Sequence, residues 1–353
     1  MMVKNILFSA FLFFFVSCIT GQKKQDAKSK KSDKTVISSP KRNTSKQKVG
    51  KNTVPQAVER TKKFAENMHF DLDYIRNKAL PDKKYLAEYL GLFLKLKKYY
   101  HNAKTDNEIQ QKLQPIYDKI NQKEFHNMAT VNDKLFKKNS MSYMRIMWLL
   151  NELGQDISKY KKEFFAIKKR MDDHMKLRGE WQRAVFDKYY DYFKLKKPTE
   201  LQYAKKLKGP IDYQKPISFY NRANAYVLTH FIFAAYDYGN SVTQNRFNKA
   251  DLAYLNTILP QIIKKFEAVN NDDIVGELLT SQVLLQQNNT PNFKNSFQRL
   301  LSRQNRDGSF GAYEKYRKKV GNDVDFRAYL HTTLVDIEMF IEDAYRKNKS
   351  RKK

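Results

Sequence analysis

Cysteine, glycine and proline are all scarce in this chain of 353 residues. The sequence has one cysteine, 11 glycines and 9 prolines. A single cysteine excludes an intramolecular disulfide, so the core alone has to hold the fold together. Few glycines and prolines leave few tight turns, and frequent Leu, Lys, Glu, Ala and Gln between them favour long helices.

Complete catalytic signatures are missing as well. The sequence has no G-x-S-x-G nucleophile turn and no glycine-rich loop that could hold a phosphate. It also lacks the H-x-x-x-H and H-x-x-E-H spacings, and zinc needs three or four converging ligands. We therefore predict no metal and no cofactor.

The N-terminus has the parts of a secretory signal peptide. Lys4 supplies the positive start, residues 6–16 are almost all apolar, and the small residue Ser17 precedes Cys18. The apolar stretch is shorter than the roughly 20 residues of a spanning helix, and no Ala-x-Ala-like site follows Ser17 as in an ordinary cleaved signal.

The end of that stretch, Phe15-Val16-Ser17-Cys18, resembles the lipobox of bacterial lipoproteins, with Phe15 where leucine is usual. The resemblance implies a signal peptide over residues 1–17, acylation of Cys18, and a mature protein held by its lipid in the bacterial cell envelope, on the periplasmic side or the outer membrane. Two or more acyl chains would give a stable membrane anchor.

A basic, polar segment follows the cysteine. Residues 22–50 contain ten Lys or Arg and two Asp, a net charge of +8 out of +30 for the whole chain. With almost no large apolar side chain, residues 18–53 are predicted to be a disordered tether. Anionic lipid or an acidic polysaccharide fits this charge, and nucleic acid is not an expected partner of an exported protein.

From residue 54 onward the apolar spacing is helical, and no period-2 alternation is convincing. We predict an all-α fold of paired antiparallel helices, with an N-terminal helical region over 54–139, a second helical domain over 140–346 and a basic tail over 347–353. Gly209-Pro210 and Pro216 interrupt the pattern and mark a long loop or internal boundary.

Several short motifs in the second half of the chain resemble motifs of known helical families. Residues 304–311, with Asp307, Gly308 and Phe310, resemble the Q-x-x-D-G-x-[FW]-G turn of terpenoid cyclases, prenyltransferases and related α/α toroids. Gly308 suits a left-handed position after a helix, Asp307 can accept backbone N–H groups, and Phe310 can pack on the neighbouring helices. A tight helix-to-helix turn without further meaning would look the same.

Further segments are similar to an uncharacterised family of toroid-like domains. They are Tyr226 to His230 with Asp237-Tyr238-Gly239, residues 329–334, and the R-x-x-W-Q-R segment from Arg178 to Arg183. The resemblance implies an α/α-toroid-like fold for the C-terminal half. It leaves the chemistry open, because the D-x-D-D run of terpene cyclases and the cysteine ligand of prenyltransferase zinc are both absent.

Polar residues inside an apolar helix give the candidate site. Tyr226, His230 and Asp237 share one face of a helix that is apolar on nearly every side, and His331 on the last helix can reach the same space. These four residues either line a cleft for ligand binding or acid–base chemistry, or serve the fold through a core hydrogen bond of His230 and a helix cap by Asp237.

A second candidate is an anion site at Arg178 and Arg183, for which an inter-helix polar contact is the alternative. Two functions remain open. One is a binding or scaffold protein of the envelope with an unidentified ligand. The other is an α/α-toroid enzyme that acts on an envelope glycan or lipid. The small number of carboxylates near the candidate site favours the binding protein.

Overall fold

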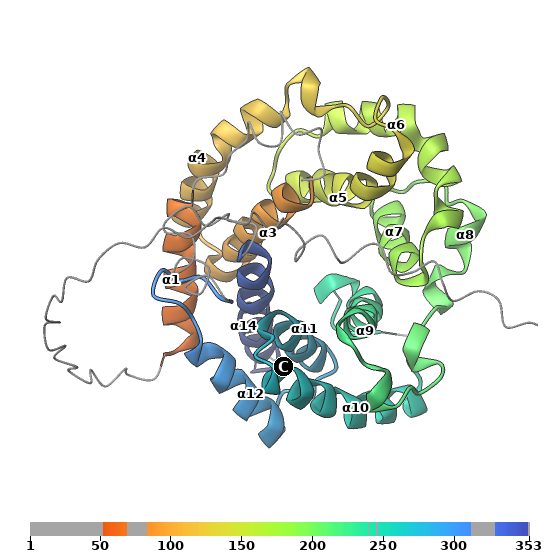
Figure 1. Cartoon of the computed structure of the whole chain (residues 1–353). Helices are drawn as coiled ribbons and strands as arrows, with labels where there is room; N and C mark the ends of the chain where they lie inside the picture. Colours follow the sequence, from red (N-terminus) through yellow and green to blue (C-terminus); the bar gives the residue numbers. More distant parts are fainter. Residues whose placement is uncertain (1–51, 69–82, 240, 245, 312–328, 352–353) are drawn as a thin grey trace, which may run out of the picture. The chain divides into compact units, whose positions relative to one another are not determined.

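The computed structural model describes residues 52–68, 83–239, 241–244, 246–311 and 329–351. Over these ranges the chain forms α-helices, short 3-10 helices and loops, without any strand (Figure 1). The predicted all-α class is confirmed. Cys18, the predicted signal peptide and nearly all of the predicted tether lie outside the described residues.

The α-helices have these bounds: α1 Val54–Asn67, α3 Lys83–Tyr100, α4 Ala103–Ile120, α5 Asp133–Glu152, α6 Ser158–Asp173, α7 Glu180–Tyr192, α8 Thr199–Gln202, α9 Arg222–Ala235, α10 Lys249–Ala268, α11 Asp272–Leu284, α12 Pro291–Ser302 and α14 Leu330–Arg351. A 3-10 turn, η7 (Asp237–Gly239), follows α9. The segment around Gly209-Pro210 and Pro216, predicted as an interruption, forms short 3-10 turns. The last helix continues to Arg351 and so includes part of the predicted basic tail.

Polar side chains fix where the helices begin. Asn102, Asn132, Asn221 and Asn248 each accept a hydrogen bond from a backbone N–H in the first turn of the helix that follows. Thr290 does the same for Phe293, ahead of proline at the first helical position of α12. These caps pair backbone groups that the first turn of a helix leaves without partners.

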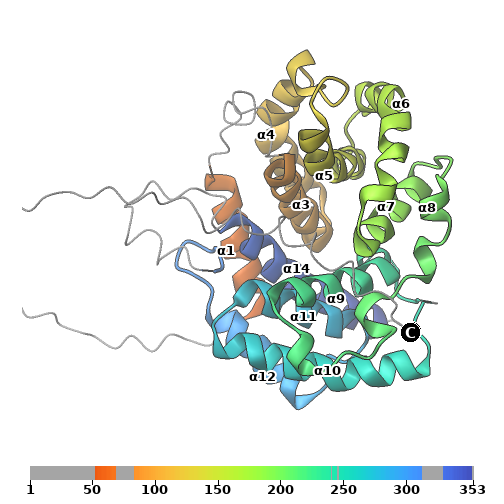
Figure 2. The ribbon, with the colours of Figure 1, turned by 45° about the vertical axis from the view of Figure 1, so that its right-hand side comes forward.

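The helices pack in two tiers within the unit formed by residues 52–353. Helices α3, α5, α7, α9, α11 and α14 each pack against the next, and α14 packs back against α3, so their contacts close a circle (Figures 1 and 2). We call these six the inner helices. The others lie outside them, with α4 on α3, α6 on α5, α8 on α7, α10 and α12 on α11, and α1 on α14.

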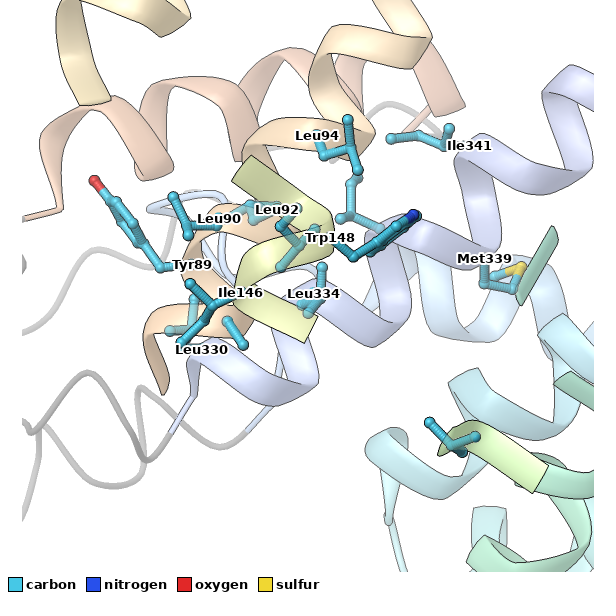
Figure 3. Packing of buried hydrophobic residues seen from close by; sticks show 14 of the residues in the cluster. Tyr89, Leu90, Leu92, Leu94, Ile146, Trp148, Leu330, Leu334, Met339 and Ile341 are labelled. Carbon is cyan, nitrogen blue, oxygen red and sulfur yellow. The ribbon is translucent and has the colours of Figure 1, made fainter. Parts of the chain in front are cut away.

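Helix α3 belongs to the region that the sequence placed ahead of the toroid-like part, yet it contacts both α5 and α14. Figure 3 shows the apolar side chains of this seam, among them Leu90, Leu92, Ile146, Leu330 and Leu334, all buried. Burial of such side chains is the main source of stability in a protein without disulfides.

In the part of the chain that the structure describes, no helix combines the length and apolar character that a membrane span requires.

The Gln304–Gly311 turn attaches the end of α12 to the first helix. Gly308 has φ +93°, and the Asp307 Oδ1 accepts a hydrogen bond from the Ser309 N–H at 3.0 Å. Thr61 of α1 donates to the Gly308 carbonyl at 2.8 Å. Phe310 is fully buried with its ring centroid 5.7 Å from that of Phe340 in α14. The turn therefore joins α1, α12 and α14.

We predict that Gly308→Ala lowers the free energy of unfolding by about 2 kcal/mol or more, because a Cβ there would lie 2.1 Å from the Arg60 carbonyl oxygen in addition to the strain of a positive φ. Gly154→Ala is the matched control, since Gly154 has φ +84° but nothing within 4 Å of its Cβ position. Denaturant unfolding measures both. Equal losses for the two variants would contradict the close docking of this turn on α1.

Candidate functional site

His331 of α14 lies between two acids from different helices. Its Nδ1 is 2.8 Å from the Glu88 Oε1 of α3, and its Nε2 is 3.3 Å from the Asp273 Oδ1 of α11. Burial opposes the charged imidazolium, but Glu88 and Asp273 outweigh it and raise the pKa of His331. Burial also opposes ionisation of Glu88, yet Lys84, His331 and Arg145 lower the pKa of Glu88 to about 2. A protonated His331 thus links three inner helices.

Asp273 receives donors from α9 as well. The Tyr226 hydroxyl donates to the Asp273 Oδ2, and the Arg222 Nη2 lies 3.2 Å from the same oxygen. Asp273 is buried, with 9% of its side chain exposed. With His331 included, one carboxylate is held by groups from α9 and α14.

Glu277 lies one helical turn after Asp273 and on the same face of α11. Burial, together with the nearby Asp273 charge, raises the pKa of Glu277 to about 8. A hydrogen bond donated by the Thr229 hydroxyl would favour the charged carboxylate and so opposes this change in the pKa of Glu277. Thr229 Oγ1 is within hydrogen-bond distance of both the Tyr226 carbonyl and the Glu277 Oε2. A hydroxyl has a single proton. If Thr229 donates to the carbonyl, a protonated Glu277 can donate to Thr229.

His230 is neutral at any ordinary pH, because burial lowers its pKa to about 3. Its Nδ1 is 2.8 Å from the Tyr226 carbonyl oxygen, a group that only accepts, so Nδ1 carries the proton. The Nε2 is therefore a hydrogen-bond acceptor. The ring of Trp181 in α7 packs against His230 with a centroid distance of 4.6 Å.

The two histidines of this group are partly exposed, whereas Glu88, Asp273 and Glu277 keep 9% or less of their side-chain surface exposed. His230 keeps 23% of its side-chain surface exposed and His331 keeps 29%. Trp181, Phe233 and Tyr238 are half-buried on the same set of helices and on η7. We use the term inner cluster for Glu88, Tyr226, Thr229, His230, Asp273, Glu277 and His331.

A second group of polar side chains surrounds Lys188 of α7. Its Nζ is 4.4 Å from the Trp148 ring centroid, 4.7 Å from that of Tyr238, and 3.5 Å from the Asp237 Oδ1. Burial lowers the pKa of Lys188 to about 8, although Asp237 opposes that change. Asp237 and Tyr238 both have positive φ, 49° and 52°, which is uncommon for residues other than glycine.

The structure therefore brings together three of the four residues predicted to share a site. Tyr226, His230 and His331 belong to the inner cluster, whereas Asp237 pairs with Lys188. Of the predicted anion site, Arg178 is buried and donates to the Lys137 carbonyl and the Ser140 hydroxyl, an inter-helix contact. Arg183 lies half-buried in the first turn of α7.

Three acids of the inner cluster were missed from the sequence: Glu88, Asp273 and Glu277. Asp273 and Glu277 lie in α11, every residue of which is buried, and Glu88 lies in the buried stretch 86–94 of α3. Like His230, these acids are polar residues among apolar neighbours in a helix, and buried polar groups of this kind need partners. The i, i+4 spacing of Asp273 and Glu277 was the available signal. Among the described residues, no group of three or more His, Cys, Asp or Glu is arranged to hold a metal ion.

A family model described as a domain of unknown function (DUF6895) matches residues 212–340. The match is shorter than half of the chain. It contains the contributions of α9, α11 and α14 to the inner cluster, and it leaves out Glu88 of α3. No curated protein and no solved structure matches the chain.

We predict that Glu277→Gln reduces the fall in melting temperature between about pH 5 and pH 8. The folded protein keeps a proton on Glu277 up to about pH 8, whereas the unfolded chain releases it near the ordinary value of 4.5. The unfolded state therefore binds fewer protons in this window, so stability decreases as pH rises. Glutamine does not titrate, so it removes the contribution of Glu277 to the pH dependence of stability. Thermal unfolding over this pH range measures the difference, and parallel pH profiles for the two proteins would contradict a protonated Glu277.

Proposed function

We propose that this protein is an envelope-anchored α/α-toroid enzyme that acts on a glycan by acid–base chemistry at the inner cluster. The observation that carries the proposal is the pair on α11. Glu277 is a neutral acid, and Asp273 one turn earlier is a carboxylate held by His331, Tyr226 and Arg222. Environments that drive two neighbouring acids to opposite protonation states are typical of acid–base sites.

Two observations support the toroid. The inner helices contact one another in a closed circle, with a second tier outside them. The Q-x-x-D-G-x-F-G turn has the conformation and contacts expected of that motif in such folds. In a fold of this type, the side chains of the inner helices face a common centre, where a ligand can meet groups from several helices at once.

The proposed reaction is hydrolysis of a glycosidic bond. Glu277 gives its proton to the leaving oxygen, a water molecule attacks the anomeric carbon, and Asp273 takes a proton from that water. The His230 Nε2 accepts a hydrogen bond from a sugar hydroxyl. The half-buried rings of Trp181, Phe233 and Tyr238 offer apolar faces beside these polar groups, the composition of a small-molecule site.

The enzyme is favoured over a non-catalytic binding protein because of the acids. The sequence offered few carboxylates near His230 and His331, and this favoured the binding protein over the enzyme. The structure adds Glu88, Asp273 and Glu277 to the same place. Neighbouring acids with different protonation states, placed beside partly exposed histidines, are typical of functional sites.

We predict that the purified protein releases reducing ends from the polysaccharide of its own cell envelope, and that Glu277→Gln lowers this rate about 100-fold or more, the usual contribution of a general acid. Glu108→Gln is the control, because Glu108 lies on the outer helix α4, where it pairs with Lys62. A wild-type protein that binds the polysaccharide without cleaving it would indicate a binding module instead, and an unchanged rate for Glu277→Gln would refute the assigned acid.

The anchor is a separate part of the proposal. We predict that cells fed a labelled fatty acid incorporate it into this protein, and that Cys18→Ser abolishes the label and releases the protein from the membrane fraction. The physical reason is that acyl chains supply the membrane affinity, at about 0.8 kcal/mol per buried methylene. Unlabelled wild-type protein, with its first residues uncleaved in the cytosol, would refute lipid anchoring.

A further inference from the structure

Arg145, on the inner helix α5, is half-buried, and among the described residues nothing forms a hydrogen bond or ion pair with its guanidinium. This is unusual for the group. A guanidinium remains charged in proteins and presents five N–H donors, and removing a charge from water without a partner costs free energy. Neighbouring charged side chains do find partners, such as Lys95 with Glu338 at 2.5 Å.

The position of Arg145 is central to the inner helices. Its charge acts on Glu88 of α3, His230 of α9 and Glu338 of α14. It also acts on Tyr189 of α7 and Tyr238 of η7. An arginine on α5 that interacts electrostatically with five other elements lies within reach of both the inner cluster and the group around Lys188.

A glycine in α3 leaves space for the guanidinium of Arg145. Gly91 lies in the middle of α3, where glycine costs about 1 kcal/mol of helix stability relative to alanine. A Cβ at that position would be 3.3 Å from the Arg145 Nη2. The close approach of α3 and α5 at Gly91 thus accommodates the arginine head group, although no described residue forms a hydrogen bond or ion pair with it.

A ligand group can supply the missing partner. The planar fork of arginine matches the two oxygens of a carboxylate or a phosphate and binds them bidentately. The nearby carboxylate of Glu88, whose pKa is lowered to about 2, is negatively charged. That charge disfavours a dianionic phosphate more than a singly charged carboxylate. The surroundings of Arg145 therefore select a carboxylate.

We propose that Arg145 binds the carboxylate of an acidic sugar, so that the substrate is a polysaccharide containing uronic acid or a similar carboxylated residue. This inference rests on the proposed function, because it places the sugar ring beside the inner cluster. The sugar carboxylate meets Arg145 on α5, its hydroxyls meet His230, and the bond to be cleaved lies at Glu277.

The two tryptophans of the chain provide a direct readout. Both lie on inner helices, Trp148 beneath the Lys188 ammonium and Trp181 against His230. A ligand on this surface changes their fluorescence, whereas a ligand on the outer helices does not. Binding can thus be measured without reference to catalysis.

The experiment titrates the full chain in detergent with an oligomer of galacturonic acid, a neutral galactose oligomer and inorganic phosphate. We expect tryptophan fluorescence to report binding of the acidic oligomer, with at least tenfold weaker binding of the neutral one. Arg145→Ala should lose at least tenfold in affinity for the acidic oligomer, and Arg145→Lys should lose less because it keeps the charge. Gly91→Ala should also weaken binding by displacing the guanidinium.

Arg306→Ala is the control, since Arg306 is an exposed arginine on the turn after α12. Melting curves establish that each variant is folded. Equal binding of the acidic and neutral oligomers, a response to phosphate alone, no response to any probe, or unchanged affinity in a folded Arg145→Ala would each overturn the proposal. Glu277→Gln should still bind the acidic oligomer, so failure of catalysis and failure of carboxylate recognition can be told apart.

Discussion

The contact on which this structure depends is the ion-paired histidine of the last helix. His331 lies 2.8 Å from Glu88 and 3.3 Å from Asp273, and so connects α14 to helices that begin almost 250 and 60 residues earlier in the chain. Both acids are buried, and leaving a buried charge unpaired typically costs 3–5 kcal/mol. The three residues therefore have to meet, and when they do, the circle of inner helices is closed.

The same closure creates the site. Once α14 and α11 lie side by side, Asp273 is held by its partners, and Glu277 one turn later is buried near that negative charge. The neutral state of Glu277 is thus a consequence of packing. His230 and Glu277 occupy adjacent inner helices, and Arg145 reaches the centre where Gly91 leaves space for it. The structural network and the proposed chemistry use the same residues.

Much of the fold could be predicted from the sequence because local residue patterns determine the helices and their ends. The helical spacing from residue 54 onward, the interruptions at Gly209-Pro210 and Pro216 and the turn at Gly308 all depend on residues a few positions apart. The return of α14 to α3 could not be predicted in this way, because it pairs segments more than 200 residues apart.

The same distinction holds for the candidate site. Residues on one helix could be recognised from the sequence, whereas residues that meet from different helices could not. Tyr226 and His230 were found because one helix displays both. Asp237 pairs with Lys188 instead, because the helix ends at Ala235 and the chain turns with positive φ at Asp237 and Tyr238. Glu88 and Arg145 could not be recognised as candidate site residues, because the neighbours that matter lie on other helices. No pattern within α3 or α5 indicates those neighbours.

The most direct test of this account is the titration of the two central histidines. The chain has six histidines, so their ring signals can be followed by nuclear magnetic resonance in the full-length protein, with assignment by substitution of His230 and His331. We predict that His331 is still protonated above pH 6.5, whereas His230 remains neutral down to about pH 3. If both rings titrate together near pH 6.5, the buried ion network and the closure that depends on it are wrong.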